Sequence, residues 1–387
     1  MKKILKFPRN FLWGVATSAY QVEGGIENCD WSKFYPAKKA CEHYRLFKKD
    51  IKLMKKLNLT AYRFSIEWSR IEPEEGKFNK KEIDHYKNFL IFLKKQNLKS
   101  MVTLWHFTTP LWLVKKGGWE NKKIIFYFKR YSEKVVEELK DFVDFWITIN
   151  EPLVYTSNSY LKGSWPPQKK NIFSFLKVVR NFIKAHKEVF LSLKEKDKKI
   201  KIGIAKSINF ISPFNRKSPL DKFSSFLAKY FWTDFFLKKI KNELDFIGLN
   251  YYTQNKIKFP FFVKKGGGRE SDIGWEIYPK GIYFVLKDLK KYNLPIFITE
   301  NGIADRKDKF RKEFIKEHLF WIHKALQEGV DVRGYFHWSL MDNLEWALGF
   351  SPRFGLIEIN YKTLERKIRP SAFYYGKIAK ENALVVP

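Results

Sequence analysis

Two glutamates follow runs of strand-forming residues and could act as a catalytic pair. Glu151 ends the sequence TINE and is followed by Pro152, while Glu300 lies in ITENG, 300 − 151 = 149 positions further along the chain. Glycoside hydrolysis uses such a pair, because one carboxylic acid protonates the leaving oxygen while one carboxylate attacks or supports the sugar carbon. A separation of roughly 5 to 5.5 Å between the carboxyl groups would indicate retention, and roughly 6.5 to 9.5 Å inversion.

Neighbouring residues are expected to hold these carboxylates. Pro152 fixes its own φ and favours extended geometry in the residue before it, so Glu151 should be extended and held in one direction. Arg63 shares one face of a predicted strand with Glu67, because side chains alternate along a strand. If that face lines a pocket, the cation would keep a nearby nucleophile ionised. An ion pair between Arg63 and Glu67 is the alternative.

Strand-like runs alternate with amphipathic helical runs along the sequence. The predicted strands, rich in Val, Ile, Phe, Tyr and Trp, are 11–17, 60–67, 99–106, 144–150, 201–207, 245–252, 295–301 and 332–339. The predicted helices are 37–58, 80–97, 121–142, 173–196, 220–241, 279–292 and 311–327. This alternation predicts an α/β fold, a single (β/α)8 TIM barrel domain over residues 1–387.

A barrel of this kind forms its active site at the carboxyl ends of its strands. Polar and aromatic residues gather at those predicted ends: Arg63, Glu67, His106, Asn150, Glu151, Asn250, Tyr252, Glu300 and Trp338. We therefore expect them to meet in one pocket. The glycine-rich segment 264–269 is expected to be either a mobile lid or a solvent-exposed excursion.

Longer motifs accompany the two glutamates along nearly the whole chain. They occupy residues 7–14, 16–24, 62–70 and 338–346. Together with the glutamate motifs they resemble glycoside hydrolase family 1, the retaining β-glycosidases of the (β/α)8 class. The resemblance implies that Glu151 is the general acid and base and that Glu300 is the nucleophile. It also implies that Arg63 and Tyr252 orient and support Glu300.

The same resemblance implies a set of substrate-binding residues. No metal and no cofactor are expected, because the sequence contains neither a His-Glu-x-x-His helix nor a phosphate-binding loop. The implied substrate-binding residues are Gln21, His106, Asn150, Asn250, Trp338, Glu345, Trp346 and Phe354. Asn150 would engage the sugar 2-hydroxyl, and Trp338 would form a platform under the ring. Taken singly, His106 could be a core histidine, Gln21 a loop contact and Trp338 barrel filling.

The implied activity is exo-acting hydrolysis of terminal β-linked sugars through a covalent glycosyl-enzyme, with a β-glucoside, β-galactoside or β-fucoside as substrate. Phe107 and Leu348 depart from the usual family pattern near the sugar, so the preferred sugar stays open. Glu345 argues against phosphorylated sugars, because a carboxylate repels phosphate. Compact connections after Glu151 and Tyr252 predict a more open aglycone site.

Two alternatives remain, an endo-acting β-glycanase of a related barrel family and a non-catalytic sugar- or nucleic-acid-binding barrel. The formal net charge of +33 favours the nucleic-acid reading. However, the lysines fall in pairs on predicted helix faces, which is typical of solvated surfaces. We therefore expect a small-molecule β-glycoside as partner, with no nucleic acid and no membrane, and leave the oligomeric state open.

The composition of the chain indicates where in the cell the protein is expected. Cys29 and Cys41 are too few for a disulfide framework, and no apolar run is long enough for a signal peptide or membrane span. A cytoplasmic location is therefore expected. His318 and His323 are five positions apart, off the shared helix face that paired metal ligands need.

Overall fold

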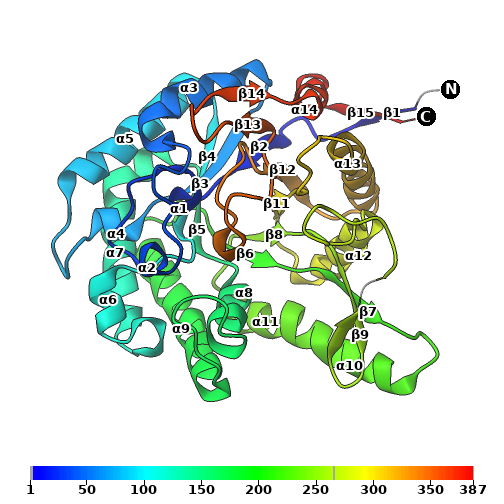
Figure 1. Cartoon of the computed structure of the whole chain (residues 1–387), viewed down its shortest axis with the longest axis horizontal. Coiled ribbons are helices and arrows are strands. Elements are labelled where there is room, and N and C mark those ends of the chain that lie inside the picture. Colours follow the sequence, from blue (N-terminus) through cyan, green and yellow to red (C-terminus); the bar gives the residue numbers. More distant parts are fainter. Residues whose placement is uncertain (1–2, 265, 387) are drawn as a thin grey trace.

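The computed structural model describes residues 3–264 and 266–386 and centres on a closed barrel of parallel strands (Figure 1). In order around the barrel these strands are β2 (Leu12–Ala16), β3 (Ala61–Ser65), β4 (Lys99–Trp105), β5 (Phe145–Asn150), β6 (Ile202–Ser207), β8 (Phe246–Asn250), β11 (Ile296–Asn301) and β12 (Val332–Trp338). Each lies within one of the runs that the sequence predicted. The predicted barrel is therefore confirmed strand by strand.

Helices surround this barrel (Figure 1). They include α3 (His43–Lys56), α5 (Lys80–Lys95), α7 (Ile124–Leu139), α9 (Ile172–Lys196), α10 (Pro219–Lys229), η4 (Tyr230–Phe235), α11 (Phe236–Ile240), α12 (Lys280–Leu289), α13 (Arg311–Gln327) and α14 (Pro370–Glu381). The prediction that the first helix starts at residue 37 is wrong. Lys38, Ala40 and Glu42 have φ values of 51°, 45° and 49°, which a right-handed helix cannot contain. Helix α14 was not predicted.

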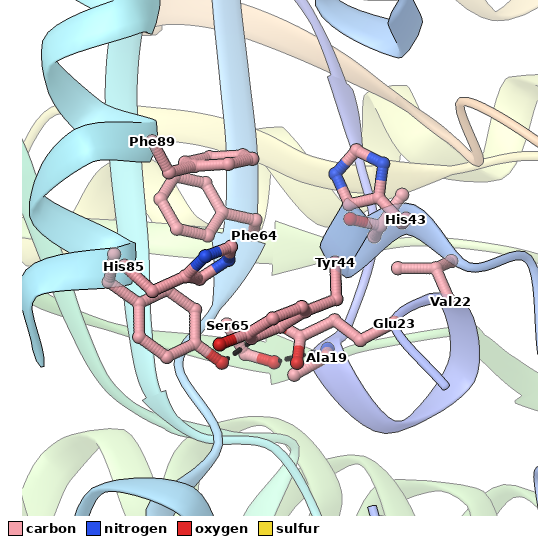
Figure 2. A pocket seen from close by; sticks show the side chains of 11 residues that line it. Ala19, Val22, Glu23, His43, Tyr44, Phe64, Ser65, His85 and Phe89 are labelled. Carbon is pink, nitrogen blue, oxygen red and sulfur yellow. Dashed lines mark hydrogen bonds between the residues drawn. The ribbon is translucent and has the colours of Figure 1, made fainter. Parts of the chain in front are cut away.

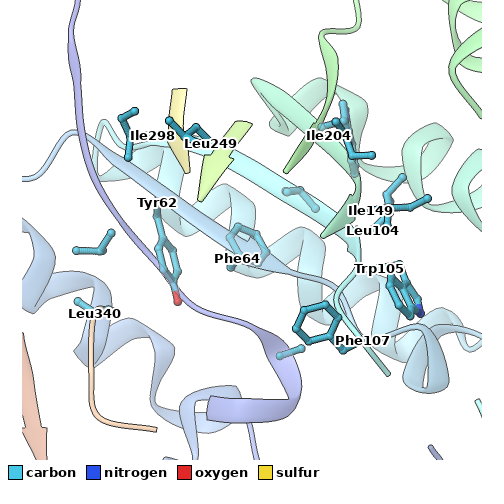
Figure 3. Packing of buried hydrophobic residues seen from close by; sticks show 14 of the residues in the cluster. Tyr62, Phe64, Leu104, Trp105, Phe107, Ile149, Ile204, Leu249, Ile298 and Leu340 are labelled. Atoms are coloured by element: carbon cyan, nitrogen blue, oxygen red, sulfur yellow. The ribbon is translucent and has the colours of Figure 1, made fainter. Parts of the chain in front are cut away.

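Alternating strand side chains build two separate layers of core. Tyr62 and Phe64 of β3 point outward and pack with Leu104, Ile204, Leu249 and Ile298 between the strands and the helices (Figure 3). Inside the barrel, the side chains that fill the interior are Ala16, Ala61, Met101, Ile147, Ala205, Phe246, Phe297 and Phe336. The barrel is thus a packed core with its open space confined to one end.

Three small sheets lie outside the barrel. β1 (Lys3–Lys6) pairs with β15 (Ala383–Val386), and β13 (Ile357–Ile359) pairs with β14 (Arg366–Ile368). β7 (Phe210–Pro213), β9 (Gln254–Lys258) and β10 (Phe262–Lys264) form a third sheet, against which α10 packs (Figure 1). None of these strands was predicted, because each is short and lacks a long apolar run.

The glycine-rich segment 264–269 follows β10, and Lys265 within it lies outside the described residues. The Gly266 N–H donates to Glu276 Oε2 at 2.8 Å, and Arg269 forms an ion pair with Glu313 at 2.6 Å. The part of the segment after Lys265 is therefore attached to neighbouring residues at two points. Within the two described ranges, none of the helices combines the length and apolar character that crossing a membrane requires.

Candidate active site

Irregular strand pairing at the barrel mouth lets adjacent residues enter the same site. The register of β5 against β6 shifts between Ile147 and Asn150, and that of β11 against β8 shifts between Ile298 and Glu300. Bulges of this kind change the direction of side chains next to active sites. As a result Asn150 and its neighbour Glu151 both accept hydrogen bonds from the same amide, that of Asn250.

The backbone of Glu151 is not extended as the sequence predicted. Its φ of 44° and ψ of 58° lie in the left-handed region, and Pro152 after it begins the short helix α8 (Pro152–Thr156). The Glu151 N–H donates to the Ala205 carbonyl at 2.8 Å, which holds the chain in this turn. The preference imposed by Pro152 is overridden by this contact, and the strain is located at the candidate site.

Both oxygens of the Glu300 carboxylate are held. Arg63 Nη1 donates to Oε1 at 2.5 Å, and the Tyr252 hydroxyl donates to Oε2 at 2.6 Å. The alternative ion pair between Arg63 and Glu67 does not form, because Glu67 accepts from the hydroxyl of Ser69 at 2.7 Å instead. Burial raises the pKa of Glu300, while the charge of Arg63 and the Tyr252 hydrogen bond oppose that rise.

Glu151 has a different environment. Asn250 Nδ2 donates to Glu151 Oε1 at 2.8 Å, and Thr299 fixes the orientation of that amide by donating to Asn250 Oδ1 at 2.6 Å. Burial, followed by the charge of Glu300, raises the pKa of Glu151 to about 8. The site therefore favours a neutral carboxylic acid at Glu151 beside a carboxylate at Glu300 that is paired with a cation.

A chain of hydrogen bonds determines which nitrogen of His106 carries a proton. Arg63 can only donate, so its 2.6 Å contact identifies Asn150 Oδ1 as an acceptor and Asn150 Nδ2 as a donor. Nδ2 lies 3.0 Å from His106 Nε2, which must therefore accept, and the proton lies on Nδ1. His106 Nδ1 is buried and has no hydrogen-bond partner. An N–H group is thus left without a partner among the described residues, which a satisfied core histidine would not show.

Glu345, in the segment after β12, contributes a second buried polar atom without a partner, its Oε2. Burial, followed by the charges of Glu300 and Glu151, raises the pKa of Glu345 to about 8. The influence of both glutamates places its carboxyl group beside the pair. An unpaired buried oxygen is costly, so this atom is suited to a hydroxyl donor from a ligand.

Gln21, on the short helix α1 (Ala19–Val22), supports the Glu345 segment from the other side. Its Nε2 donates to Asn343 Oδ1 at 3.0 Å and to the Leu344 carbonyl at 2.5 Å, while its Oε1 accepts from Ser18 at 2.6 Å. Both amide hydrogens are therefore used within the protein. Only the second lone pair of Oε1 remains for a ligand.

Aromatic rings border these polar groups. His106 stacks 6.0 Å from Trp338 and 5.9 Å from Trp346, measured between ring centroids. Phe354 lies 6.2 Å from Tyr252 and provides an apolar wall. Every residue of the predicted site is thus found at or next to the barrel mouth, including the less direct contributors Gln21 and Phe354.

The two departures from the family pattern lie in different surroundings. Phe107 is buried, and its ring centroid is 5.0 Å from that of Trp346, so it helps to shape the site. Leu348 is exposed on the rim. Phe107 therefore packs against the predicted site residue Trp346, whereas Leu348 is turned to solvent.

Lys206 was not predicted as a site residue. It is buried on β6, and its Nζ donates to the carbonyl of Trp232 in η4. Burial lowers the pKa of Lys206 to about 7, and the charge of Glu151 opposes that effect. The sequence did contain a signal for this burial, because Lys206 directly follows the apolar run Ile202–Ala205 of a predicted strand.

A small cavity elsewhere does not belong to this site. It lies behind β3 and is lined by Glu23, Tyr44, His85 and Tyr86 among others (Figure 2). Tyr86 donates to Glu23 Oε1 at 2.8 Å, and His85 stacks on Tyr44 with 3.7 Å between ring centroids. Tyr44 donates to Glu82 at 3.0 Å, and His43 contacts Asp50 at 2.8 Å, so these lining side chains already have partners within the protein. In the described ranges, no three His, Cys, Asp or Glu side chains group as metal ligands would.

A (β/α)8 barrel with two buried carboxyl groups in contrasting environments at its mouth defines a glycoside hydrolase. The model of glycosyl hydrolase family 1 matches residues 4–239 and 229–384. Beta-glucosidase A of Thermotoga maritima is 35% identical over 442 residues, which cover 98% of this chain and 99% of that protein. The chain therefore belongs to glycosyl hydrolase family 1.

Solved structures agree with this assignment. The beta-glycosidase from Pyrococcus horikoshii superposes with a TM-score of 0.94 and 41% identity, covering 99% of this chain and 96% of that one. The beta-glucosidase from Thermotoga maritima in complex with glucoimidazole superposes with a TM-score of 0.92 and 34% identity, covering 97% and 99%. The match to Beta-glucosidase A spans 442 positions although this chain has 387 residues, so at least 442 − 387 = 55 positions have no counterpart here.

Proposed function

We propose that this chain is a retaining, exo-acting β-glycosidase that releases a terminal non-reducing sugar from β-glucosides, β-galactosides or β-fucosides. The single observation that carries the proposal is the contrast between Glu300, which is held by Arg63 and Tyr252, and the neutral acid Glu151. Glu300 attacks the anomeric carbon while Glu151 gives its proton to the leaving oxygen. Glu151 then takes a proton from water, which displaces Glu300 and releases the sugar.

The remaining residues hold the sugar in this scheme. Asn150 contacts the 2-hydroxyl, and His106 donates from Nδ1 to a further hydroxyl. Glu345 Oε2 accepts from another hydroxyl, and Gln21 accepts through its Oε1. Trp338 lies under the ring, with Trp346 and Phe354 as walls and Asn250 orienting Glu151. The support is that buried polar atoms of His106 and Glu345 lack partners within the protein.

Exo action is supported by the similarity to Beta-glucosidase A rather than by the packed barrel interior, since such an interior is common to exo- and endo-acting barrels. The endo-acting alternative requires the sugar chain to continue past the site in both directions. Whether the compact connections open the aglycone side, the cytoplasmic location and the lack of a nucleic-acid partner remain predictions from the sequence.

The test is a panel of nitrophenyl β-glycosides with the wild-type enzyme, Glu300→Gly and Glu151→Gly, each with and without azide. Azide should restore turnover of Glu300→Gly and give a glycosyl azide of inverted configuration, because it replaces the missing nucleophile. With Glu151→Gly the azide should instead give a product of retained configuration. The assignment fails if Glu300→Gly keeps wild-type activity or yields the retained azide. Release of internal fragments from a β-glucan would favour the endo-acting alternative.

A further inference from the structure

Helix α10 presents its large apolar side chains to solvent. Leu220, Phe223 and Phe226 are 55%, 57% and 67% exposed. The residues that the helix buries are Asp221, Ser224, Ser225 and Ala228. A surface helix that only packs on a protein core has the reverse arrangement, with its large apolar side chains turned inward. The outward face of α10 is therefore not explained by the packing of this chain.

A second set of exposed apolar residues lies next to this helix. The hairpin of β9 and β10 has the sequence KFPFFVK from the end of β9 through β10, and its Phe259, Phe261, Phe262 and Val263 are 47% to 61% exposed. Asp221 joins the two elements, because its Oδ1 accepts from the Phe259 N–H at 2.9 Å. We call these residues of α10 and of the β9–β10 hairpin the aromatic patch, together with two neighbours, Phe214 directly after β7 and Tyr230 at the start of η4. Its members are Phe214, Leu220, Phe223, Phe226, Tyr230, Phe259, Phe261, Phe262 and Val263.

The charges around the aromatic patch are almost all positive. Segments 214–230 and 254–264 contain seven Lys and Arg residues and one acidic residue, Asp221. Asp221 is occupied by the backbone N–H groups of Asn215 and Phe259, both at 2.9 Å. Lys229 forms an ion pair with Asp288 at 2.5 Å, whereas Lys222 and Lys258 project into solvent among the apolar side chains. The surface therefore combines projecting phenylalanines with exposed cations.

Exposed aromatic rings beside positive charges limit what can bind to the aromatic patch. A second copy of the chain would bring a like-charged patch on a molecule of net charge +33, and the two would repel. An anionic lipid surface matches the cations, and its fluid acyl region can enclose rings that project from a helix and a hairpin. The sequence predicted no membrane partner because it contains no spanning segment, and a peripheral contact needs none.

We propose that the aromatic patch docks the enzyme on the surface of an anionic lipid bilayer. The phenylalanines of α10 and of the β9–β10 hairpin enter the boundary between headgroups and acyl chains, while Lys222 and Lys258 contact the headgroups. None of the residues of the aromatic patch belongs to the candidate active site described above.

The test measures binding of the full chain to sedimented vesicles of phosphatidylcholine, alone or mixed with phosphatidylglycerol. The wild-type enzyme should bind the mixed vesicles, and added salt should weaken binding. The triple variant Phe223→Ser, Phe226→Ser, Phe262→Ser keeps every charge, and its binding should fall roughly ten- to hundredfold. The control Phe126→Ser, Phe373→Ser removes rings that are 60% and 50% exposed on other helices, and its binding should stay unchanged.

Hydrolysis of a soluble aryl glycoside at wild-type rate shows that each variant is folded. If the triple variant misfolds, Phe262→Ser in the hairpin and Lys222→Glu on α10 each replace it, and both should weaken binding. The proposal is overturned if the wild-type enzyme ignores mixed vesicles, or if removing the phenylalanines leaves binding intact, since diffuse basic charge then explains it. A change in sedimentation mass without a change in vesicle binding would assign the patch to contacts between copies and also overturn the proposal.

Discussion

Arg63 and Glu300 form an ion pair across the barrel mouth, with Nη1 of the arginine 2.5 Å from Oε1 of the glutamate. The two residues come from β3 and β11 and are 237 positions apart in the chain. Both side chains are almost inaccessible to water. A buried carboxylate of this kind depends on its partner, because the charge cannot be solvated otherwise.

Replacing Arg63 by Met should therefore raise the pKa of Glu300. Attack requires the ionised form of Glu300, so a higher pKa leaves more of it protonated at any given pH, and the acid limb of kcat/KM should move to higher pH. We expect kcat to fall by roughly 10² to 10³. A pH profile with an aryl β-glycoside checks this. Arg333→Met, which breaks the exposed ion pair with Asp331, is the control and should leave the profile unchanged. An unshifted acid limb in Arg63→Met would argue against the proposed nucleophile.

In the proposed mechanism Glu151 determines the basic limb of the pH profile of kcat/KM. Since its pKa is raised to about 8 and its protonated form is the acid, kcat/KM should decline as the pH rises through about 8. Glu151→Gln has no proton to give, so substrates with poor leaving groups should lose roughly 10²- to 10⁴-fold in rate, and activated aryl glycosides much less. Comparing nitrophenyl and alkyl glycosides measures this difference. Equal losses on both substrates would contradict the assigned acid.

Lys206 is expected to have a smaller effect on this basic limb. Its charge lowers the pKa of Glu151, but its own pKa of about 7 leaves little of that charge near pH 8, so Lys206→Met should move the basic limb to higher pH by only a small fraction of a unit. Lys201→Met, at an exposed position just before the same strand, serves as the matched control. A shift in the control equal to that in Lys206→Met would show that general surface charge, rather than the buried ammonium group, is responsible.

Gly302 follows the β11 glutamate motif and permits the closest approach of two backbone segments at the mouth. A Cβ at this position would lie 1.7 Å from the carbonyl oxygen of Trp338. Gly302→Ala should therefore destabilise the fold by about 2 to 4 kcal/mol and lower kcat, because Glu300 and Trp338 must both move. Thermal unfolding measures the first effect. Gly25→Ala, with φ of +67° but nothing within 4 Å of the added carbon, should cost only about 1 kcal/mol. Similar losses in the two variants would exclude the clash as the cause.

The barrel and the inward direction of Arg63 could be predicted, because both follow from local patterns. Long apolar runs mark the strands, and a period of two places Arg63 on the face opposite Tyr62 and Phe64. The left-handed turn at Glu151 could not be predicted in this way. It depends on a hydrogen bond to Ala205, 205 − 151 = 54 positions away, and local preference points to the opposite geometry.

Other features escaped prediction for the same reason. The register shifts in β5 and β11 depend on neighbouring strands, so a strict alternation misplaces one residue of each pair at the mouth. The apolar spacing of α10 predicts a helix but not which side faces the protein. Lys206 resembles an ordinary surface lysine until the contact with the Trp232 carbonyl places it inside.

The side chains that fill the barrel interior, among them Met101, Phe246 and Phe336, close one end of the site. Substrate, attacking water, the released aglycone and the freed sugar must therefore all use a single entrance. In the proposed mechanism the freed sugar lies deepest and leaves last, so it would compete with the next substrate molecule for the same space. We therefore expect turnover to slow as free sugar accumulates around the enzyme.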